Sequence, residues 1–476
     1  MEILLTAVFF IGYLIIALEH PLKINKAGTA LITGILLWII YAAAPQMAAQ
    51  FNAADVEAFM KANPSMLSLS LTNQCLHYIV DWQIINSLGE ISETLFFLIG
   101  AMTIVEIIDV HGGFAIITNR ITTKSKLRLV WIVAIITFFL SALLDNMTTA
   151  IVMIMLVRRI IPNYKERWVF GSLVIIAANS GGAWSPIGDI TTIMLWVNGN
   201  ITADHIVPWL FLPSFVSCMI PTWIGSKYLH GMIIESDKES STPSGLSLQK
   251  IITRKESISI SLLGILCLVS VPIFKSVTHL PPFMGILLSL GVIWVYTELV
   301  YAKKKGVDES LKHRVPRVLR RIDTPTILFF LGILLAVSAL QATGILGSAA
   351  KFLDTNIHNV YVTNIFIGLL SSVIDNVPLV AASMAMYPVA DAAQIAASID
   401  PVYMSHFVTD GVFWQFLAYC AGVGGSVLII GSVAGVVVMG IEKMNFMWYM
   451  KNISPMALAG YLAGAAVYIL QVWLFA

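Results

Sequence analysis

The stretch Leu144-Asp145-Asn146-Met147-Thr148-Thr149 places an aspartate in the middle of a long apolar segment. The stretch Ile374-Asp375-Asn376-Val377-Pro378 does the same, with its Asp-Asn pair 230 positions further along the chain. An ionisable side chain at membrane depth is costly and is usually retained for function. The two Asp-Asn pairs therefore mark the places around which we expect both the fold and the function to be organised.

The sequences around the two pairs are similar to each other. Upstream, Leu-Phe-Phe-Leu occurs at 95–98 and again at 328–331, and each copy is followed by two glycines twelve positions apart. Downstream, a glycine pair and a third glycine recur with the same spacing, at 181, 182 and 188 and again at 424, 425 and 431. A repeat of this length, with polar residues inside apolar segments, is typical of secondary transporters.

Composition predicts an all-α polytopic membrane protein. Hydrophobic residues make up 58% of the 476 residues, charged residues only 12%, and the mean hydropathy is +0.85. The net charge of +1 gives no sign of a nucleic-acid surface, which needs concentrated basic residues. The four cysteines lack CxxC spacing, so we expect buried thiols and no disulfide frame. No basic leader precedes the first apolar run, and we expect residues 3–17 to remain as a membrane helix.

Apolar stretches of about 20 residues are needed to cross roughly 30 Å of hydrocarbon as a helix. Ten such crossings are expected near residues 3–18, 27–44, 91–110, 168–198, 205–226, 256–274, 283–301, 325–343, 411–440 and 453–475. Two more apolar stretches, 129–157 and 360–389, are too long for one straight helix and short for two. Each has its Asp-Asn pair at the centre, so we interpret each as a re-entrant helical hairpin.

The distribution of Lys and Arg predicts the orientation. Basic residues flank the first hairpin on both sides, which places both of its ends in the cytoplasm by the positive-inside rule. The second hairpin lies in a stretch without Lys or Arg between Lys351 and Lys443, so both of its ends are expected outside. Both termini then fall outside as well.

This topology predicts an inverted repeat. Residues 1–226 and 256–476 each hold five crossings, one of them broken at its centre, and one hairpin, and an odd number of crossings inverts the second half. Residues 227–255 are polar and are expected to form a cytoplasmic linker. The Asn, Pro and Ser content of the external segment 45–90 suggests a loop together with a short interfacial helix.

The spans 168–198 and 411–440 contain the glycine clusters and are expected to be broken helices, whose unwound carbonyls can serve as ligands. Carboxylate, amide and hydroxyl groups join these carbonyls, and all of them are oxygen ligands of the kind that hard cations prefer. The first half offers Asp145, Asn146, Thr148, Asp189, Thr191 and Thr192, and the second half offers Ser371, Ser372, Asp375, Asn376 and Ser426.

Buried carboxylates of this kind predict competition between two ions. Burial disfavours a bare carboxylate charge, which is therefore neutralised by a proton or by a bound cation. A transporter whose proton-loaded and cation-loaded sites both cross, but whose empty site does not, exchanges the two ions.

The two Asp-Asn motifs and the stretch Asn179-Ser180-Gly181-Gly182-Ala183-Trp184-Ser185-Pro186-Ile187-Gly188-Asp189 resemble the NhaD-type sodium/proton antiporters of the ion transporter superfamily. The resemblance covers nearly the whole chain. It implies export of Na⁺ or Li⁺ in exchange for protons, no cofactor, a role in pH homeostasis, and a homodimer in the bacterial inner membrane. It also implies ion binding around Asp145, Asn146, Asn179, Asp189, Thr191 and Thr192, with further polar positions at Ser141, Ser371, Asp375 and Asn376.

Simpler interpretations exist for several of these residues. An aspartate within a span can cap a helix, and Asp189 can do so while still binding an ion. Glu106 and Asp109, one helical turn apart, could belong to a proton path or to a solvated helix end. His20 and His111 could sense pH, but an exposed loop histidine is the commoner case.

The main rival function is a sodium-coupled carboxylate or other anion transporter of the same superfamily. Asp145 and Asp189 argue against it, because two acids would repel an anionic substrate in a low dielectric. An enzyme is not expected, since no HExxH signature or nucleophile with a paired base is present. Broken helices in inverted copies favour alternating access over a channel.

Overall fold

The computed structural model of the chain describes residues 1–17, 22–113, 123, 125–229, 231–232, 252–304, 312–373 and 376–475. These residues are mostly helical and form no strand, apart from one isolated bridge between Ser125 and Met232. By length and apolar composition, 6 described helical stretches can cross a membrane, and shorter apolar helices accompany them. The predicted class, an all-α polytopic membrane protein, is confirmed, whereas the inverted repeat stays a prediction.

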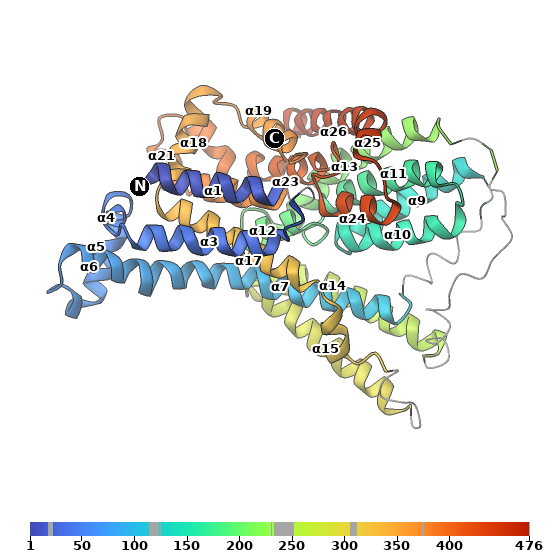
Figure 1. Cartoon of the computed structure of the whole chain (residues 1–476), viewed down its shortest axis with the longest axis horizontal. Coiled ribbons are helices and arrows are strands. Elements are labelled where there is room, and N and C mark those ends of the chain that lie inside the picture. Colours follow the sequence, from blue (N-terminus) through green and yellow to red (C-terminus); the bar gives the residue numbers. More distant parts are fainter. Residues whose placement is uncertain are drawn as a thin grey trace. The chain divides into compact units, whose positions relative to one another are not determined.

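The chain divides into two compact units, and both are built from separated segments (Figure 1). Unit 1 holds Met1–Leu95, Asp323–Thr363 and Val377–Asp391, and unit 2 holds Phe96–Ile322, Asn364–Asn376 and Ala392–Ala476. Three helices belong partly to each unit: α7 (Ile84–Val110), α19 (Val360–Leu370) and α20 (Asn376–Met386).

Unit 1 is centred on α3 (Lys26–Ala42) and α17 (Thr324–Ala342), which pack against each other. The indole of Trp38 donates to the carbonyl of Leu335 at 3.0 Å. The other helices of this unit are α1 (Glu2–Ala17), α4 (Gln46–Phe51), α5 (Ala53–Ala62), η1 (Pro64–Met66), α6 (Leu71–His77), η2 (Tyr78–Gln83), α18 (Ile345–Asn356) and α20 (Asn376–Met386), whose first residue lies in unit 2.

The expectation of a mostly irregular segment at 45–90 is wrong. Helices fill this segment, and from Leu71 to Val110 they form one continuous helical stretch of 40 residues, with a π-helical turn at Tyr78–Gln83. The segment is tied to α17 through the carbonyl of Ala342, which accepts from the Asn52 amide at 2.7 Å. Contacts of this kind order residues whose Asn, Pro and Ser content suggested a loop.

Unit 2 contains most of the apolar helices. Capping residues and prolines mark where several of these helices begin. A capping box formed by Thr253 and Glu256 starts α14, and Pro282 occupies the first turn of α15. The elements of this unit are α9 (Lys126–Ser141), α10 (Asn146–Ile160), α11 (Tyr164–Gly182), α12 (Ile190–Val197), α13 (Ala203–Ser226), α14 (Arg254–Thr278), α15 (Pro282–Ala302), α16 (Val315–Val318), η5 (Leu319–Arg321), α21 (Ala392–Ala397), α22 (Pro401–Met404), η6 (Ser405–Phe407), α23 (Val412–Gly424), α24 (Val433–Glu442), α25 (Phe446–Asn452) and α26 (Ser454–Phe475).

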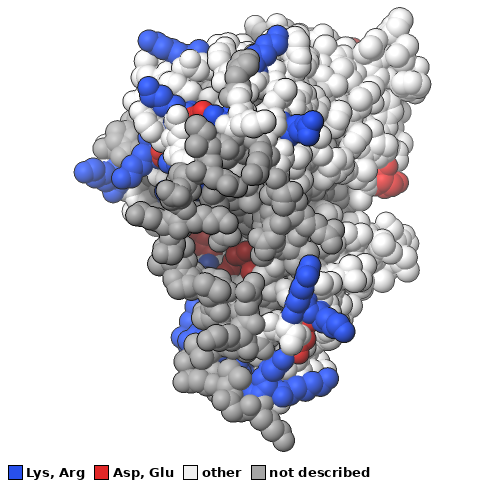
Figure 2. All heavy atoms as spheres, turned by 90° about the vertical axis from the view of Figure 1, so that its right-hand side faces the viewer, with Lys and Arg blue, Asp and Glu red and all other residues white. Residues whose placement is uncertain are grey.

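Ion pairs link basic residues near several helix ends of unit 2 to acidic residues of neighbouring helices. Lys126 at the start of α9 pairs with Glu166 at 2.8 Å, while Arg158 near the end of α10 and Arg167 in α11 both pair with Glu442, at 3.3 and 2.8 Å. The start of α9 therefore pairs with the first turn of α11, and Glu442 at the end of α24 joins α10 and α11. Figure 2 shows Lys and Arg side chains at several places on one face of the molecule, with a few acidic side chains among them.

The expectation that His111 is an exposed loop histidine is wrong. Its side chain is buried, with Nδ1 at 2.7 Å from the Ile107 carbonyl and Nε2 at 2.8 Å from the Tyr301 hydroxyl. A carbonyl cannot donate, so Nδ1 carries the proton and Nε2 accepts from Tyr301. His20 lies outside the described residues.

The expectation of buried cysteines is confirmed, because all four are free and buried.

Candidate functional site

The first Asp-Asn pair lies at the break between α9 and α10. The carboxylate of Asp145 caps α10, accepting from the backbone N–H of Thr148 at 2.7 Å and from its hydroxyl at 2.6 Å. An aspartate satisfies the free N–H groups of a helix start, where the helix dipole also favours negative charge. The side chain of Asp145 nevertheless remains partly exposed.

The second acid lies at the break between α11 and α12. Asp189 caps α12, accepting from the backbone N–H and the hydroxyl of Thr191 at 2.9 Å each, and Thr192 completes a capping box. Its side chain is buried at 2% exposure, although it lies in unwound chain. Glycine allows this break to be compact, because a methyl group on Gly182 would lie 2.5 Å from the Gly188 carbonyl oxygen.

Two asparagines connect these breaks in one buried network. The amide of Asn146 donates to the Asp189 carboxylate at 2.6 Å and to the side-chain oxygen of Asn179 at 3.1 Å. Asn146 is the first residue of α10, and Asn179 lies in the last turn of α11. The tip of the α9–α10 pair is therefore hydrogen-bonded directly to both sides of the broken helix.

The network continues into the broken helix of the second half. The amide of Asn179 donates to the hydroxyls of Ser426 at 2.9 Å and Ser432 at 2.8 Å, and both serines are buried. Ser426 follows the end of α23, and Ser432 caps α24. A methyl group on Gly422 would lie 3.2 Å from the Cβ of Ala183, so the two broken helices cross in close contact.

Ser432 is a residue that the sequence reasoning missed. The signal was present, because Ser432 follows Gly431 just as Asp189 follows Gly188, and these glycines hold matching places in the two glycine clusters. The corresponding cap therefore carries a charge in the first half and a neutral hydroxyl in the second.

The other predicted residues of the second half lie around a similar break between α19 and α20. Ser371 donates to the Ala421 carbonyl at 3.1 Å, and Ser372 donates to the Leu369 carbonyl at 2.7 Å. Asn376 is buried at the start of α20, while Asp375 lies outside the described residues. In the first half, Ser141 makes a comparable bond to the Ala178 carbonyl at 2.6 Å.

The chemistry of the network is that of a hard-cation site. It offers carboxylate, amide and hydroxyl oxygens together with main chain near the two breaks, and such ligands suit alkali and other hard cations. Within the described ranges, no group of three or more His, Cys, Asp or Glu side chains could hold a metal ion.

Glu106 lies apart from this network. It pairs with Arg321 at 3.3 Å, and the Arg321 side chain is 52% exposed. This pairing fits the interpretation of a solvated helix end.

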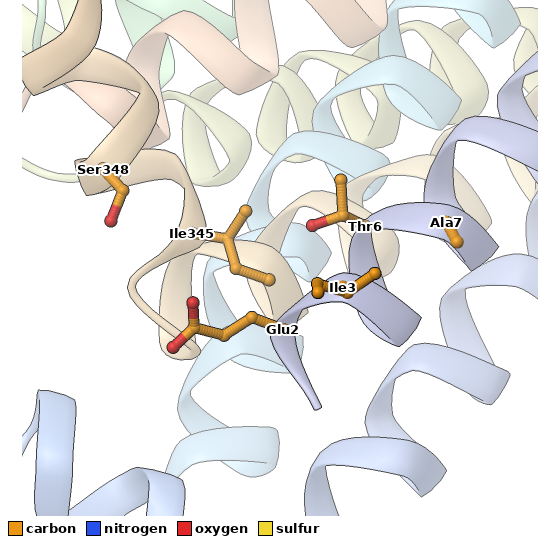
Figure 3. Close-up of a pocket in the computed structure, with 6 residues that line it drawn as sticks. All are labelled: Glu2, Ile3, Thr6, Ala7, Ile345 and Ser348. Atoms are coloured by element: carbon orange, nitrogen blue, oxygen red, sulfur yellow. The ribbon is translucent and has the colours of Figure 1, made fainter.

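A surface pocket of about 390 Å³ also lies elsewhere, in unit 1 beside α1 and α18. Figure 3 shows its lining, which combines the carboxylate of Glu2 with Ile3, Ile345 and the hydroxyls of Thr6 and Ser348. The pocket contains one exposed carboxylate, two hydroxyls and apolar side chains. Its lining therefore does not resemble the buried network of amides and carboxylate.

Known proteins resemble this chain over almost its whole length. A family described as CitMHS, citrate transporter, matches residues 13–409. "Sodium/proton antiporter 1" of Arabidopsis thaliana is 42% identical over 471 residues, covering 98% of this chain and 72% of that protein. "Na(+)/H(+) antiporter NhaD" of Alkalimonas amylolytica is 28% identical over 491 residues, covering 97% of this chain and 89% of that protein.

The chain belongs to the CitMHS family, as an NhaD-type member of the ion transporter superfamily. The resemblance predicted from its motifs is therefore confirmed. Like these relatives, the NhaD-type chain is a membrane transporter and not an enzyme.

Proposed function

We propose that the protein is a secondary antiporter that exports Na⁺ or Li⁺ in exchange for protons by alternating access. The observation that carries the proposal is the Asn146–Asp189–Asn179 network, in which a buried carboxylate lies between two helix breaks. The relatives at 42% and 40% identity, described as sodium/proton antiporters, support the same activity.

The exchange follows from charge balance at the acids of the two breaks. A buried carboxylate without a counter-ion is costly, so Asp189, at 2% exposure, holds either a proton or the cation, and the partly exposed Asp145 shares this role. The amide of Asn146 stabilises the charged form of Asp189 but cannot neutralise it. Competition between proton and cation for these acids then couples the two fluxes.

The rival activity is sodium-coupled uptake of a carboxylate, which the citrate-transporter description of the family suggests. Two acids at the breaks of the first half disfavour an anion at the same place, because like charges repel strongly when water is excluded. In the second half, the neutral Ser432 caps α24 in place of an acid. An anionic substrate would meet no carboxylate at this cap, and this is the feature that favours the carboxylate-uptake activity.

A ΔpH assay in everted membrane vesicles tests the proposal. Adding Na⁺ or Li⁺ is expected to collapse the proton gradient, while K⁺ and Ca²⁺ are added as comparison ions. Asp145→Ala and Asp189→Ala are each expected to abolish the response. Uptake of citrate or succinate with Na⁺, without proton movement by Na⁺ alone, would establish the anion carrier instead.

The chain supplies a matched control for helix capping. Asp323 caps α17 much as Asp145 caps α10, accepting from the backbone N–H of Thr326 at 3.3 Å and from its hydroxyl at 2.6 Å. Asp323→Ala therefore removes a comparable cap without touching the network. Exchange should persist in Asp323→Ala. If Asp323→Ala and Asp145→Ala lost exchange equally, the effect of Asp145→Ala would be explained by the loss of a helix cap and not by ion binding.

The proposal includes the predicted inverted repeat with two re-entrant hairpins, and a homodimer in the bacterial inner membrane that serves pH homeostasis. The opposite orientation of the two halves is supported by the Lys and Arg pattern of the sequence. Crosslinking in membranes tests the dimer separately from the exchange assay.

A further inference from the structure

Thr149 lies on the buried stripe of α10 that begins at the candidate ion site. The buried residues Asn146, Thr149, Ala150, Met153 and Val157 follow one another at helical spacing, so they share one face of the helix. Thr149 has no exposed surface. Its side chain therefore points to the same side as Asn146, whose amide binds Asp189.

The hydroxyl of Thr149 differs from other buried threonine hydroxyls in the helices of this protein. Thr33, Thr137 and Thr222 each donate to the carbonyl four residues earlier, at 2.8, 2.6 and 2.8 Å. The Thr149 hydroxyl has no hydrogen-bond partner among the described residues. The carbonyl four residues earlier, that of Asp145, accepts the backbone N–H of Thr149 at 3.1 Å.

A buried hydroxyl without a partner destabilises a fold, and valine would fill nearly the same volume without that cost. A threonine at this place is therefore explained by a partner other than the described residues, such as a bound cation. Thr149 itself lies about one helical turn from Asp145 and Asn146.

We infer that the Thr149 hydroxyl is a direct oxygen ligand of the transported alkali cation, an inference that rests on the proposed function. The ligand belongs to the first half alone. The residue four positions after Asp375 is Leu379, which offers no oxygen, whereas Thr149 stands four positions after Asp145. The two hairpin tips thus contribute unequally to ion binding.

Three variants test this assignment. Thr149→Val removes the hydroxyl at nearly constant volume, Thr149→Ser keeps it, and Thr137→Val is the matched control, because Thr137 is equally buried but bonds its own helix. We expect Thr149→Val to raise the half-saturating Na⁺ concentration about tenfold or more. Thr149→Ser and Thr137→Val should stay within about twofold of the wild type.

A second readout separates this inference from the proposed function. Na⁺ added to the purified protein should raise its melting temperature through binding to the folded state, and less so in Thr149→Val. Equal Na⁺ dependence in wild type and Thr149→Val, by either readout, overturns the assignment. If the wild type moves no protons with Na⁺, the antiport proposal fails, while the melting curves still decide whether Thr149 binds the ion.

Discussion

Asn179 is the residue at which the polar groups of both halves meet. Its oxygen accepts from Asn146, and its amide donates to Ser426 and Ser432, so it makes three side-chain hydrogen bonds in a fully buried position. An amide is suited to this place because it offers an acceptor and two donors in one rigid plane. Neither aspartate nor leucine could satisfy all three partners.

We therefore expect Asn179→Ala to reduce the exchange rate more than tenfold and to destabilise the protein. The change leaves buried polar partners unsatisfied, and each such group costs about 1–3 kcal/mol. Exchange in vesicles and melting in detergent measure the two effects. Asn198→Ala, at an exposed asparagine after α12, is the control, and a similar loss there would refute a special role for Asn179.

His111 predicts how stability depends on pH. Burial lowers its pKa to about 4, opposed by the Ile107 carbonyl and assisted by nearby His313. In the unfolded chain a histidine titrates near about 6.5, so between these values only the unfolded state binds the proton. Stability is therefore complete above pH ~6.5 and falls as the pH drops toward 4.

The expected loss reaches roughly 3 kcal/mol at pH 4, from the linkage between the pKa shift and stability. Melting temperatures of the purified protein between pH 7.5 and pH 4.5 measure it. His111→Gln should show a flatter pH dependence. Identical slopes in the variant and the wild type would show that another group controls acid stability.

Among the elements, the broken helices depend on glycine where backbone meets backbone. A methyl group on Gly181 would overlap the carbonyl of Phe138, so α9 and α11 approach each other more closely than any side chain permits. This contact lies beside Asn179 and holds the end of α11 against the α9–α10 pair.

Gly181→Ala is expected to destabilise the protein by about 1–3 kcal/mol or more, because the added methyl group forces two backbones apart. Exchange should fall with it. In Gly440→Ala, the new methyl group meets nothing within 4 Å in the exposed part of α24, so stability should stay constant or rise by about 0.5–1 kcal/mol. Thermal unfolding of both variants makes the comparison, and equal effects would contradict the packing argument.

For the molecule as a whole, apolar length predicts the class, and the resemblance of the two Asp-Asn motifs and of the stretch 179–189 predicts the family. The same resemblance implied one site around Asn146, Asn179 and Asp189; hydrogen bonds join these three side chains, while ion binding there stays a prediction. His111 could not be placed, since its hydroxyl partner Tyr301 lies 190 residues away and no local pattern indicates the contact. Segment 45–90 was misread because contacts with α17, not composition, order its helices.

The topology predicted from Lys and Arg can be checked by cysteine labelling. The native cysteines are buried and should react little with a membrane-impermeant maleimide. Lys61→Cys is expected to react from the outside, and Lys227→Cys only in everted vesicles, since both native side chains are exposed. Labelling of Lys61→Cys from the cytoplasmic side alone would reverse the orientation.

The close contact of Gly182 with Gly188 bears on which ions can enter the first half of the molecule. Main chain packed this closely resists expansion, because a close-packed interior has low compressibility. At the proposed cation site beside this break, we therefore expect K⁺, which is larger than Na⁺, to bind less well, because the backbone cannot move apart to accommodate it.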